Sequence, residues 1–231
     1  MSKLVILVII PCILVAAGLG SNPPDAQNRA ASGDSDAQVR QFLDKHRWSW
    51  SDMNIPEADG QALYDIILKH GYKNALEIGT SSGHSGIWIA WALSKTGGKL
   101  VTIEIDRGRH EEALANFREA GVAKYIDARL DDAHRLVPAL PGPFDFVFCD
   151  ADKDWYKNYL AAVVPKMAVG GCFAAHNVSE GSYGGRYRRG FGGGYGDNFL
   201  QYARSLPNLE TTVLALRGSA GMSISYKKAE K

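Results

Sequence analysis

Short apolar stretches alternate with segments of helical spacing along most of the chain, and this alternation limits the folds it can adopt. Strands are predicted for residues 74–79, 99–105, 125–130, 144–149 and 170–175. Helices are predicted for residues 39–46, 57–70, 85–93 and 108–120, for a short segment ending at 140, and for 155–167. Repeated strand–helix units with apolar strands are typical of a mostly parallel sheet covered on both faces. The sequence therefore predicts an α/β fold.

Ligands of such sheets bind at the carboxyl ends of the strands. That edge of the sheet is therefore where functional residues are expected. The segments that follow the predicted strands are residues 77–85, 104, 131–133, 150–153 and 176–177.

A glycine turn, Leu76-Glu-Ile-Gly-Thr-Ser-Ser-Gly-His-Ser, follows the first predicted strand. Gly79 and Gly83 permit a tight turn and a close approach of the backbone to a ligand. The spacing differs from the Gly-x-Gly-x-x-Gly pattern of dinucleotide-binding turns. An acid, Glu77, precedes the first glycine, which suits a ligand that carries a positive charge. An ordinary strand–helix turn is the alternative interpretation.

Glu104 ends the second predicted strand. A carboxylate at this place can accept hydrogen bonds from both hydroxyls of a ribose. A solvated carboxylate at a strand end is the alternative. Together with Glu77, this residue indicates a nucleoside with a positively charged, zwitterionic tail, which describes S-adenosylmethionine.

Three motifs resemble the class I S-adenosylmethionine-dependent O-methyltransferases, in particular the catechol and caffeoyl-CoA O-methyltransferase group. They are the glycine turn, Thr102-Ile-Glu-Ile-Asp and Phe146-Val-Phe-Cys-Asp-Ala-Asp-Lys-Asp-Trp-Tyr, and the resemblance covers about residues 53–227. It implies a Rossmann-like three-layer sandwich with a seven-stranded, mostly parallel sheet whose last strand is antiparallel. Residues 211–216 and 222–226 would then form strands six and seven. The implied activity is methyl transfer to a hydroxyl of a small, aromatic, catechol-like acceptor.

The resemblance also implies which residues contact the cofactor. Glu77, Gly79 and Ser85 are matched to the methionine part, and Glu104 is matched to the ribose. Asp132 and Ala133 are matched to the adenine side. Asn54 and Ile55 are matched to the segment that covers the cofactor, and Asp150 to the strand end beside it. Asp131 stands where the family usually has glycine, so the adenine side departs from the family pattern.

Methyl transfer to a hydroxyl requires an in-line approach, a deprotonated oxygen and exclusion of water. In the family, the residue at the position of Asp150 is a metal ligand. The residue at the position of Lys153 acts as the general base or orients the hydroxyl. We therefore expect Asp150, Lys153 and the neighbouring His176 to carry the chemistry.

A metal-binding position of the family is also changed in this chain: His176 stands where a second metal-binding Asp is usual, whereas Asn177 matches. Magnesium and calcium prefer oxygen ligands, and imidazole suits zinc, iron, nickel or copper. Three alternatives follow. Asp150, His176 and Asn177 bind a transition metal; the site binds magnesium weakly; or the metal is lost and His176 serves as the base, since its ordinary pKa lies near 6.5.

The front of the chain differs from the rest. Residues 4–20 contain no charged side chain and follow Lys3, which predicts a signal peptide or a membrane anchor within residues 1–20. Residues 21–36 are predicted to be a flexible linker, and residues 37–231 the methyltransferase domain. With the basic end retained inside, an anchor places that domain on the far side of the membrane.

The 26 Lys and Arg and 25 Asp and Glu residues give a net charge of +1, which argues against a dedicated nucleic-acid binder. Residues 181–196 combine glycine, arginine and aromatic side chains. We favour the interpretation that they form a loop at the entrance of the substrate site. The alternative is that they bind RNA, which would make this an RNA-associated protein. A cofactor-binding protein without catalysis is another alternative.

Cys149 and Cys172 are expected to be offset along neighbouring strands and unable to form a disulfide. The family also suggests a homodimer.

Overall fold

The computed structural model describes residues 24–50, 53–180 and 195–229. The apolar segment 4–20 and most of the glycine–arginine segment 181–196 lie outside the described residues, so the expectations for them stay predictions. Within the described ranges, no helix is both long enough and apolar enough to cross a bilayer.

Contacts divide the chain into two units, residues 1–34 and 35–231. The second unit begins close to the domain start predicted at 37. Helix α1 spans Pro24–His46, so it runs through residues for which we predicted a flexible linker. Three alanines between positions 26 and 31 favour the helical backbone, which the polar composition of this stretch had obscured.

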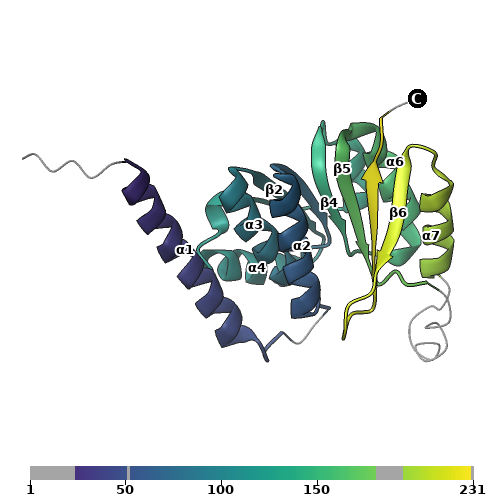
Figure 1. The fold of residues 1–231 in the computed structure, drawn as a ribbon. Helices are drawn as coiled ribbons and strands as arrows, with labels where there is room; N and C mark the ends of the chain where they lie inside the picture. The colour runs from purple at the N-terminus through teal and green to yellow at the C-terminus, as the bar shows by residue number, and fades with distance from the viewer. Residues whose placement is uncertain (1–23, 51–52, 181–194, 230–231) are drawn as a thin grey trace, which may run out of the picture. The chain divides into compact units, whose positions relative to one another are not determined.

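A seven-stranded sheet forms the centre of the second unit, in the order β3-β2-β1-β4-β5-β7-β6 (Figure 1). The neighbouring pairs from β3 to β5 are parallel, whereas β7 runs antiparallel to both β5 and β6. The predicted fold, including the antiparallel last strand, is confirmed. The strands are β1 (Asn74–Ile78), β2 (Lys99–Glu104), β3 (Ile126–Leu130), β4 (Phe144–Cys149), β5 (Met167–His176), β6 (Leu209–Leu214) and β7 (Met222–Lys227).

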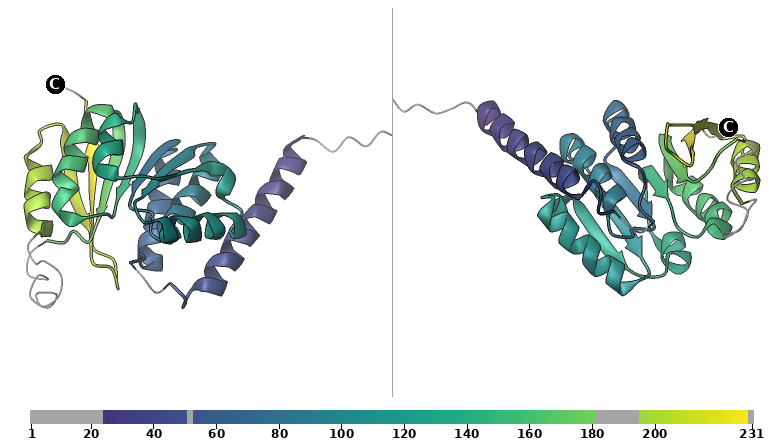
Figure 2. Two further views of the ribbon diagram at one scale, coloured as in Figure 1. Left: turned by 180° about the vertical axis from the view of Figure 1, so that it is seen from behind. Right: turned by 90° about the horizontal axis from the view of Figure 1, so that it is seen from below.

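Helices cover both faces of this sheet (Figure 2). Because successive strand side chains point to opposite faces, Leu76 and Val147 pack with α5, α6 and α7, whereas Ala75 and Phe146 pack with α2 and α3. A third cluster joins the C-terminal part of α1 to α3 and α4. The helices are α2 (Glu57–His70), α3 (His84–Thr96), α4 (Arg107–Glu119), α5 (Ala133–Ala139), α6 (Tyr156–Val163) and α7 (Tyr195–Ser205), with 3-10 turns at Ala123–Tyr125, Lys153–Trp155 and Val164–Lys166.

The register of β4 and β5 determines whether the two buried cysteines could form a disulfide. Cys172 pairs with Phe146, whereas Cys149 pairs with Ala175, so the thiols lie at different heights along the sheet. Both are free. The prediction that they are offset and unbridged is confirmed.

The carboxyl ends of β1 and β4 lie very close together. Asp150 N donates to Ile78 O at 2.9 Å, and Gly79 has a φ of 96°. A Cβ at Gly79 would lie 2.6 Å from the carbonyl oxygen of Asp150. Glycine is required here for both reasons, and its absence of a side chain is what allows the two strand ends to meet.

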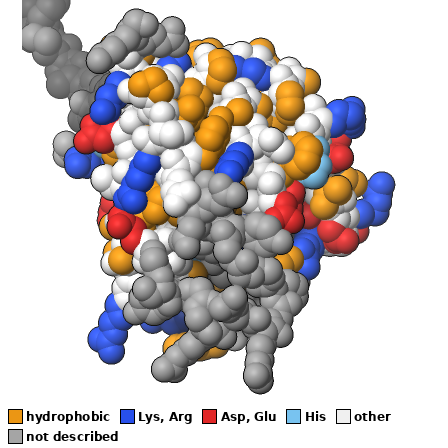
Figure 3. All heavy atoms as spheres, turned by 90° about the vertical axis from the view of Figure 1, so that its right-hand side faces the viewer, with side chains coloured by type: hydrophobic (Ala, Val, Ile, Leu, Met, Phe, Trp, Pro, Cys, Tyr) orange, Lys and Arg blue, Asp and Glu red, His pale blue; other side chains and the backbone are white. Residues whose placement is uncertain are grey.

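Acidic and basic side chains are interspersed with apolar ones on the side that carries β6 and α7 (Figure 3). On the described part of this side, no broad basic area gathers. This described part of the surface is in keeping with the nearly balanced charge of the chain.

Candidate functional site

Four charged side chains meet at the carboxyl ends of β4 and β5. Nζ of Lys153 donates to Oδ1 of Asp150 at 2.5 Å, and Nδ1 of His176 lies 3.1 Å from the other oxygen, Oδ2, of Asp150. Nε2 of His176 lies 2.9 Å from Oδ2 of Asp59. The structure thus brings together the three predicted chemical residues and adds a fourth that was not predicted.

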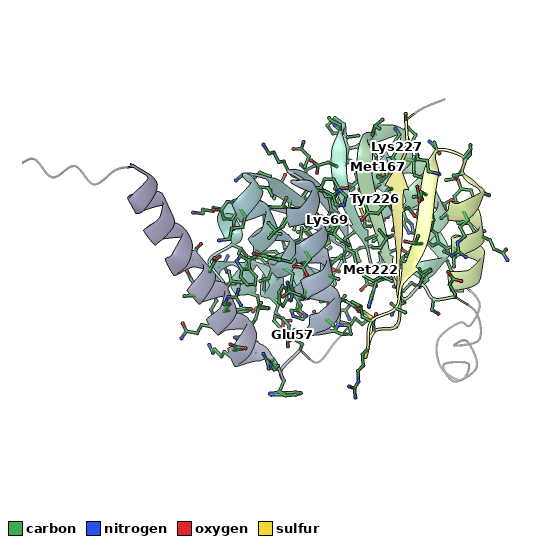
Figure 4. The ribbon with its side chains drawn as sticks, in the orientation of Figure 1. Glu57, Lys69, Met167, Met222, Tyr226 and Lys227 are labelled. Atoms are coloured by element: carbon green, nitrogen blue, oxygen red, sulfur yellow. The ribbon has the colours of Figure 1, made fainter. Side chains whose placement is uncertain are left out.

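The secondary structure explains how these residues converge. Asp150 directly follows β4, Lys153 begins the 3-10 turn after it, and His176 is the last residue of β5. Asp59 lies in the first turn of α2 and is fully buried. In Figure 4, Glu57 at the start of α2 and Met222, the β7 partner of His176, lie toward the lower end of the molecule, whereas Met167 at the start of β5 lies toward the upper end.

Asp59 is the functional residue that the sequence analysis missed. It precedes Leu63 by four positions and Ile67 by eight, which places a carboxylate in line with the buried face of its helix. That was the available signal, since an acid on an apolar face is seldom buried without a partner. The partner itself lies far away in the chain and could not be identified from spacing.

His176 is held as a cation by its surroundings. Burial alone would lower the pKa of its ring, but hydrogen bonds and charge attraction from Asp150 and Asp59 raise that pKa to about 9. Burial opposes ionisation of Asp150 too, yet His176 and Lys153 lower the pKa of this carboxyl below its ordinary value. The cluster therefore contains two carboxylates balanced by an imidazolium and an ammonium.

Tyr156 forms the floor of this cluster. Its hydroxyl accepts from Nζ of Lys153 at 2.6 Å and donates to the carbonyl oxygen of His176 at 3.3 Å. Burial and the neighbouring carboxylates raise the pKa of Tyr156 well above its ordinary value. The phenol therefore stays neutral and holds the Lys153 amine in place.

The residues predicted to bind a metal do not fit a divalent cation as they are placed. Both ring nitrogens of His176 face carboxylate oxygens, and the side chain of the neighbouring Asn177 is exposed on a backbone with a φ of 57°. In the part of the chain that the structure describes, no group of three or more His, Cys, Asp or Glu side chains is arranged to hold a metal ion.

Glu77 is a fully buried acid beneath the glycine turn. Oγ1 of Thr102 donates to its Oε2 at 2.5 Å, and Ser85 also hydrogen bonds to this carboxyl. Burial raises the pKa of Glu77 to about 7, with Asp150 and Glu104 adding to the rise. Its second oxygen, Oε1, has no hydrogen-bond partner among the described residues. A buried acceptor of this kind needs a donor, and a ligand with a positive charge would supply one.

Glu104 is nearly buried at the end of β2, beside the glycine turn. Its Oε2 accepts from the backbone N–H of Ser81 at 2.7 Å, and its Oε1 accepts from those of Ile105 and Asp106. Each carboxylate oxygen has two lone pairs, so Oε2 retains one for a further donor. That remaining lone pair could accept a hydrogen bond from one ribose hydroxyl.

The segment that contains Asn54 and Ile55 is tied to the glycine turn. Oγ of Ser82 donates to Oδ1 of Asn54 at 3.1 Å, and Nδ1 of His84 lies 3.0 Å from the carbonyl oxygen of Ile55. Nε1 of Trp88 donates to Nε2 of His84, so the ring of His84 is neutral with its proton on Nδ1. Burial lowers the pKa of His84 to about 4, in keeping with this tautomer. A cavity of about 250 Å³ adjoins these residues.

The predicted adenine-side residues lie at the start of α5. Asp132 is the N-cap of this helix, where its side chain accepts from His134 N, and Ala133 is the first helical residue. The ring of His134 stacks on Trp155 at 4.1 Å and contacts Asp152, which ties the start of α5 to the segment after β4. Asp132 therefore has a structural role as a cap, whatever it contacts in a ligand.

Comparisons with known proteins agree with this arrangement. The model of a family described as O-methyltransferase matches residues 30–182. Caffeoyl-CoA O-methyltransferase 1 of Eucalyptus globulus is 34% identical over 146 residues, which are 61% of this chain and 58% of that protein. The enzyme of Zinnia elegans is 34% identical over 147 residues, 61% of this chain and 59% of that protein. The chain thus spans less than two thirds of the length of these relatives.

Solved structures show the same likeness. The O-methyltransferase TomG of Streptomyces achromogenes, in complex with SAM, has a TM-score of 0.69 and 26% identity over 83% of this chain and 90% of its own. Cofactor-bound Rv0187 from MTB has a TM-score of 0.70 and 25% identity over 91% and 99% of the two chains. Because the family model covers well over half of the sequence, the chain belongs to the O-methyltransferase family.

Proposed function

We propose that this protein is an S-adenosylmethionine-dependent O-methyltransferase that acts on a hydroxyl of a small aromatic acceptor. The proposal is carried by Oε1 of Glu77, which is buried and has no hydrogen-bond partner among the described residues. Glu77 lies close enough to Asp150, in the cluster with Lys153 and His176, for the two charges to interact. Family membership and the SAM complex of TomG support the cofactor. The names of the caffeoyl-CoA relatives support an aromatic acceptor.

The residues around the glycine turn fit this cofactor. Glu77 offers a carboxylate to its ammonium group, and Glu104 offers an acceptor to the ribose. Gly79 and Ser85 belong to this turn, and Asn54 and Ile55 are hydrogen bonded to it. We assign the start of α5 to the adenine side of the cofactor. When bound, S-adenosylmethionine supplies an electrophilic methyl group on a sulfonium.

Lys153 is the residue that we place at the acceptor hydroxyl. In the ligand-free cluster Lys153 is an ammonium, so it must first release one proton to solvent. Its neutral amine could then accept the proton of the acceptor hydroxyl. Asp150 and Tyr156 hold this amine by hydrogen bonds from two sides. His176 is unsuited as the base, because both of its ring nitrogens already donate to carboxylates. Its role is to fix and neutralise Asp150.

Transfer of an isotope-labelled methyl group to a panel of catechols and other phenols tests the proposal. We expect label in an O-methyl product for at least one catechol. Cofactor binding measured by calorimetry with no transfer to any phenol would instead favour the cofactor-binding protein without catalysis. No cofactor binding at all would refute the proposed function.

Residues 4–20 carry a separate proposal, that they export the protein or anchor it in a membrane. It is supported by the length and composition of that segment alone. Fractionation of cells that express the full chain, with and without residues 1–20, distinguishes a membrane-bound protein from a released one.

A homodimer is likewise proposed only from the family likeness, and light scattering tests it.

A further inference from the structure

We infer that the strand-end site of this protein works without a divalent metal, because the imidazole of His176 bridges Asp59 and Asp150 and itself takes the place of the cation. The inference about metal binding concerns the chain alone. Its consequence for methyl transfer rests on the proposed function.

The geometry of the ring leaves no coordinating atom for a metal. Its two nitrogens lie 3.1 Å from Oδ2 of Asp150 and 2.9 Å from Oδ2 of Asp59. An ionised carboxylate can only accept hydrogen bonds, so each nitrogen must carry a proton to satisfy its neighbour. Metal binding by histidine requires a deprotonated nitrogen with its lone pair directed at the ion. His176 offers none while both contacts persist.

The local charges are also already balanced. Asp150 is shared between His176 and Lys153, whose Nζ lies 2.5 Å from Oδ1. Asp59 has His176 as its ion-pair partner. Two carboxylates therefore face two cationic side chains, and a divalent ion would add an excess of positive charge. Oδ1 of Asp59 has no hydrogen-bond partner among the described residues, but the charge of this carboxylate is already matched by His176. Hard cations such as Mg²⁺ are bound where the charge of several carboxylates remains uncompensated.

Burial makes the bridge difficult to open. The side chain of Asp59 is fully buried and that of His176 is 6% exposed. A metal that displaced the ring would have to break both ion pairs and leave the buried imidazolium without its carboxylate partners. We therefore expect the bridge, rather than a metal, to hold the start of α2 against the end of β5.

A metal titration of three full-length proteins tests the inference. Binding of Mn²⁺ is followed by loss of the electron paramagnetic resonance signal of the free ion, and binding of Zn²⁺ by calorimetry. We expect no saturable binding by the wild type. His176→Asp places a third carboxylate beside Asp59 and Asp150, and we expect this variant to bind Mn²⁺ saturably. His176→Asn, which removes the ring without adding charge, is the matched control and should not gain this affinity.

Stoichiometric binding of Mn²⁺ or Zn²⁺ by the wild type that is lost in His176→Asn would overturn the inference, because the ring would then be a ligand. If His176→Asp does not fold, ¹⁵N spectra of histidine-labelled wild type decide instead. We expect two protonated ring nitrogens for His176 and no change on addition of Zn²⁺. A single ring proton with a Zn²⁺-dependent shift would count against the bridge. These readouts stand whether or not methyl transfer is found.

Discussion

Nε2 of His176 lies 2.9 Å from Oδ2 of Asp59, although 117 positions separate the two residues in the chain. The contact joins the first turn of α2 to the last residue of β5. Nδ1, the other ring nitrogen of His176, faces Asp150. The side chain of His176 therefore connects α2 to the ends of β4 and β5. The pair is therefore expected to contribute to stability as well as to the shape of the site.

Replacement of Asp59 by Asn should reduce the free energy of unfolding by about 3–5 kcal/mol near neutral pH, because it leaves the His176–Asp150 pair without its second carboxylate. Urea denaturation measures this loss. Asp65→Asn, in the same helix but exposed, is the matched control and should lie within about 0.5 kcal/mol of the wild type. Equal effects of the two changes would show that the buried pair contributes nothing.

The same variant should change how stability depends on pH. The pKa of His176 is raised from 6.5 to about 9, so its contribution is fully present below about pH 6.5 and is lost as pH rises through 9. Without Asp59, that pKa moves back toward its ordinary value, and the decline between these pH values becomes shallower. Glu77 is common to both proteins, so the difference between the two curves isolates His176. Parallel curves would contradict the assignment.

Replacement of Lys153 by Ala should lower kcat for methyl transfer by about 10²–10⁴-fold, the usual contribution of a positioned proton acceptor. Lys157→Ala, one helical turn further on, should retain turnover near the wild-type rate. Lys153→Arg separates two roles, because arginine keeps the charge beside Asp150 but does not accept a proton near neutral pH. Full activity in the arginine variant would assign Lys153 to orientation rather than proton transfer.

Replacement of Glu77 by Gln should weaken cofactor binding by about 10–100-fold, which corresponds to loss of a charged hydrogen bond. The pKa of Glu77 in the ligand-free protein is about 7, and pairing with an ammonium requires the ionised form. Wild-type affinity should therefore rise as pH increases through 7, with protons released on binding. Calorimetry in buffers of different ionisation enthalpy measures both effects. An equally steep pH dependence in the Gln variant would exclude Glu77 as its source.

Replacement of Gly79 by Ala should cost more stability than the strain of its backbone alone. Its φ is 96°, and a Cβ would also lie 2.6 Å from Asp150 O. Gly97→Ala is the matched control, since Gly97 has a φ of 76° but no atom within 4 Å of an added Cβ. We expect Gly97→Ala to cost about 1 kcal/mol and Gly79→Ala clearly more, with weaker cofactor binding only in the latter. Matching losses would show that the close approach of β1 and β4 tolerates a methyl group.

Much of the fold was predictable because its signals are local. The strand from 144 to 149 is continuous apolar sequence, and the structure gives it the same bounds. The offset of Cys149 and Cys172 followed from the parallel pairing of adjacent strands. Residues 24–36 were harder, because their polar composition suggested a linker whereas the structure continues α1 through them. In this segment the polar composition does not indicate the backbone conformation.

The sequence by itself determined which side chains stand at the carboxyl ends of the strands, among them Asp150, Lys153 and His176. Chain connectivity and the two-residue period of a strand suffice for that. Only the tertiary structure decided that His176 is enclosed between two carboxylates. The second of them, Asp59, comes from a helix that precedes the sheet, and no local rule sets the rotation or docking of that helix. A hydrogen bond depends on distances of about 3 Å between such elements, and packing alone sets those distances.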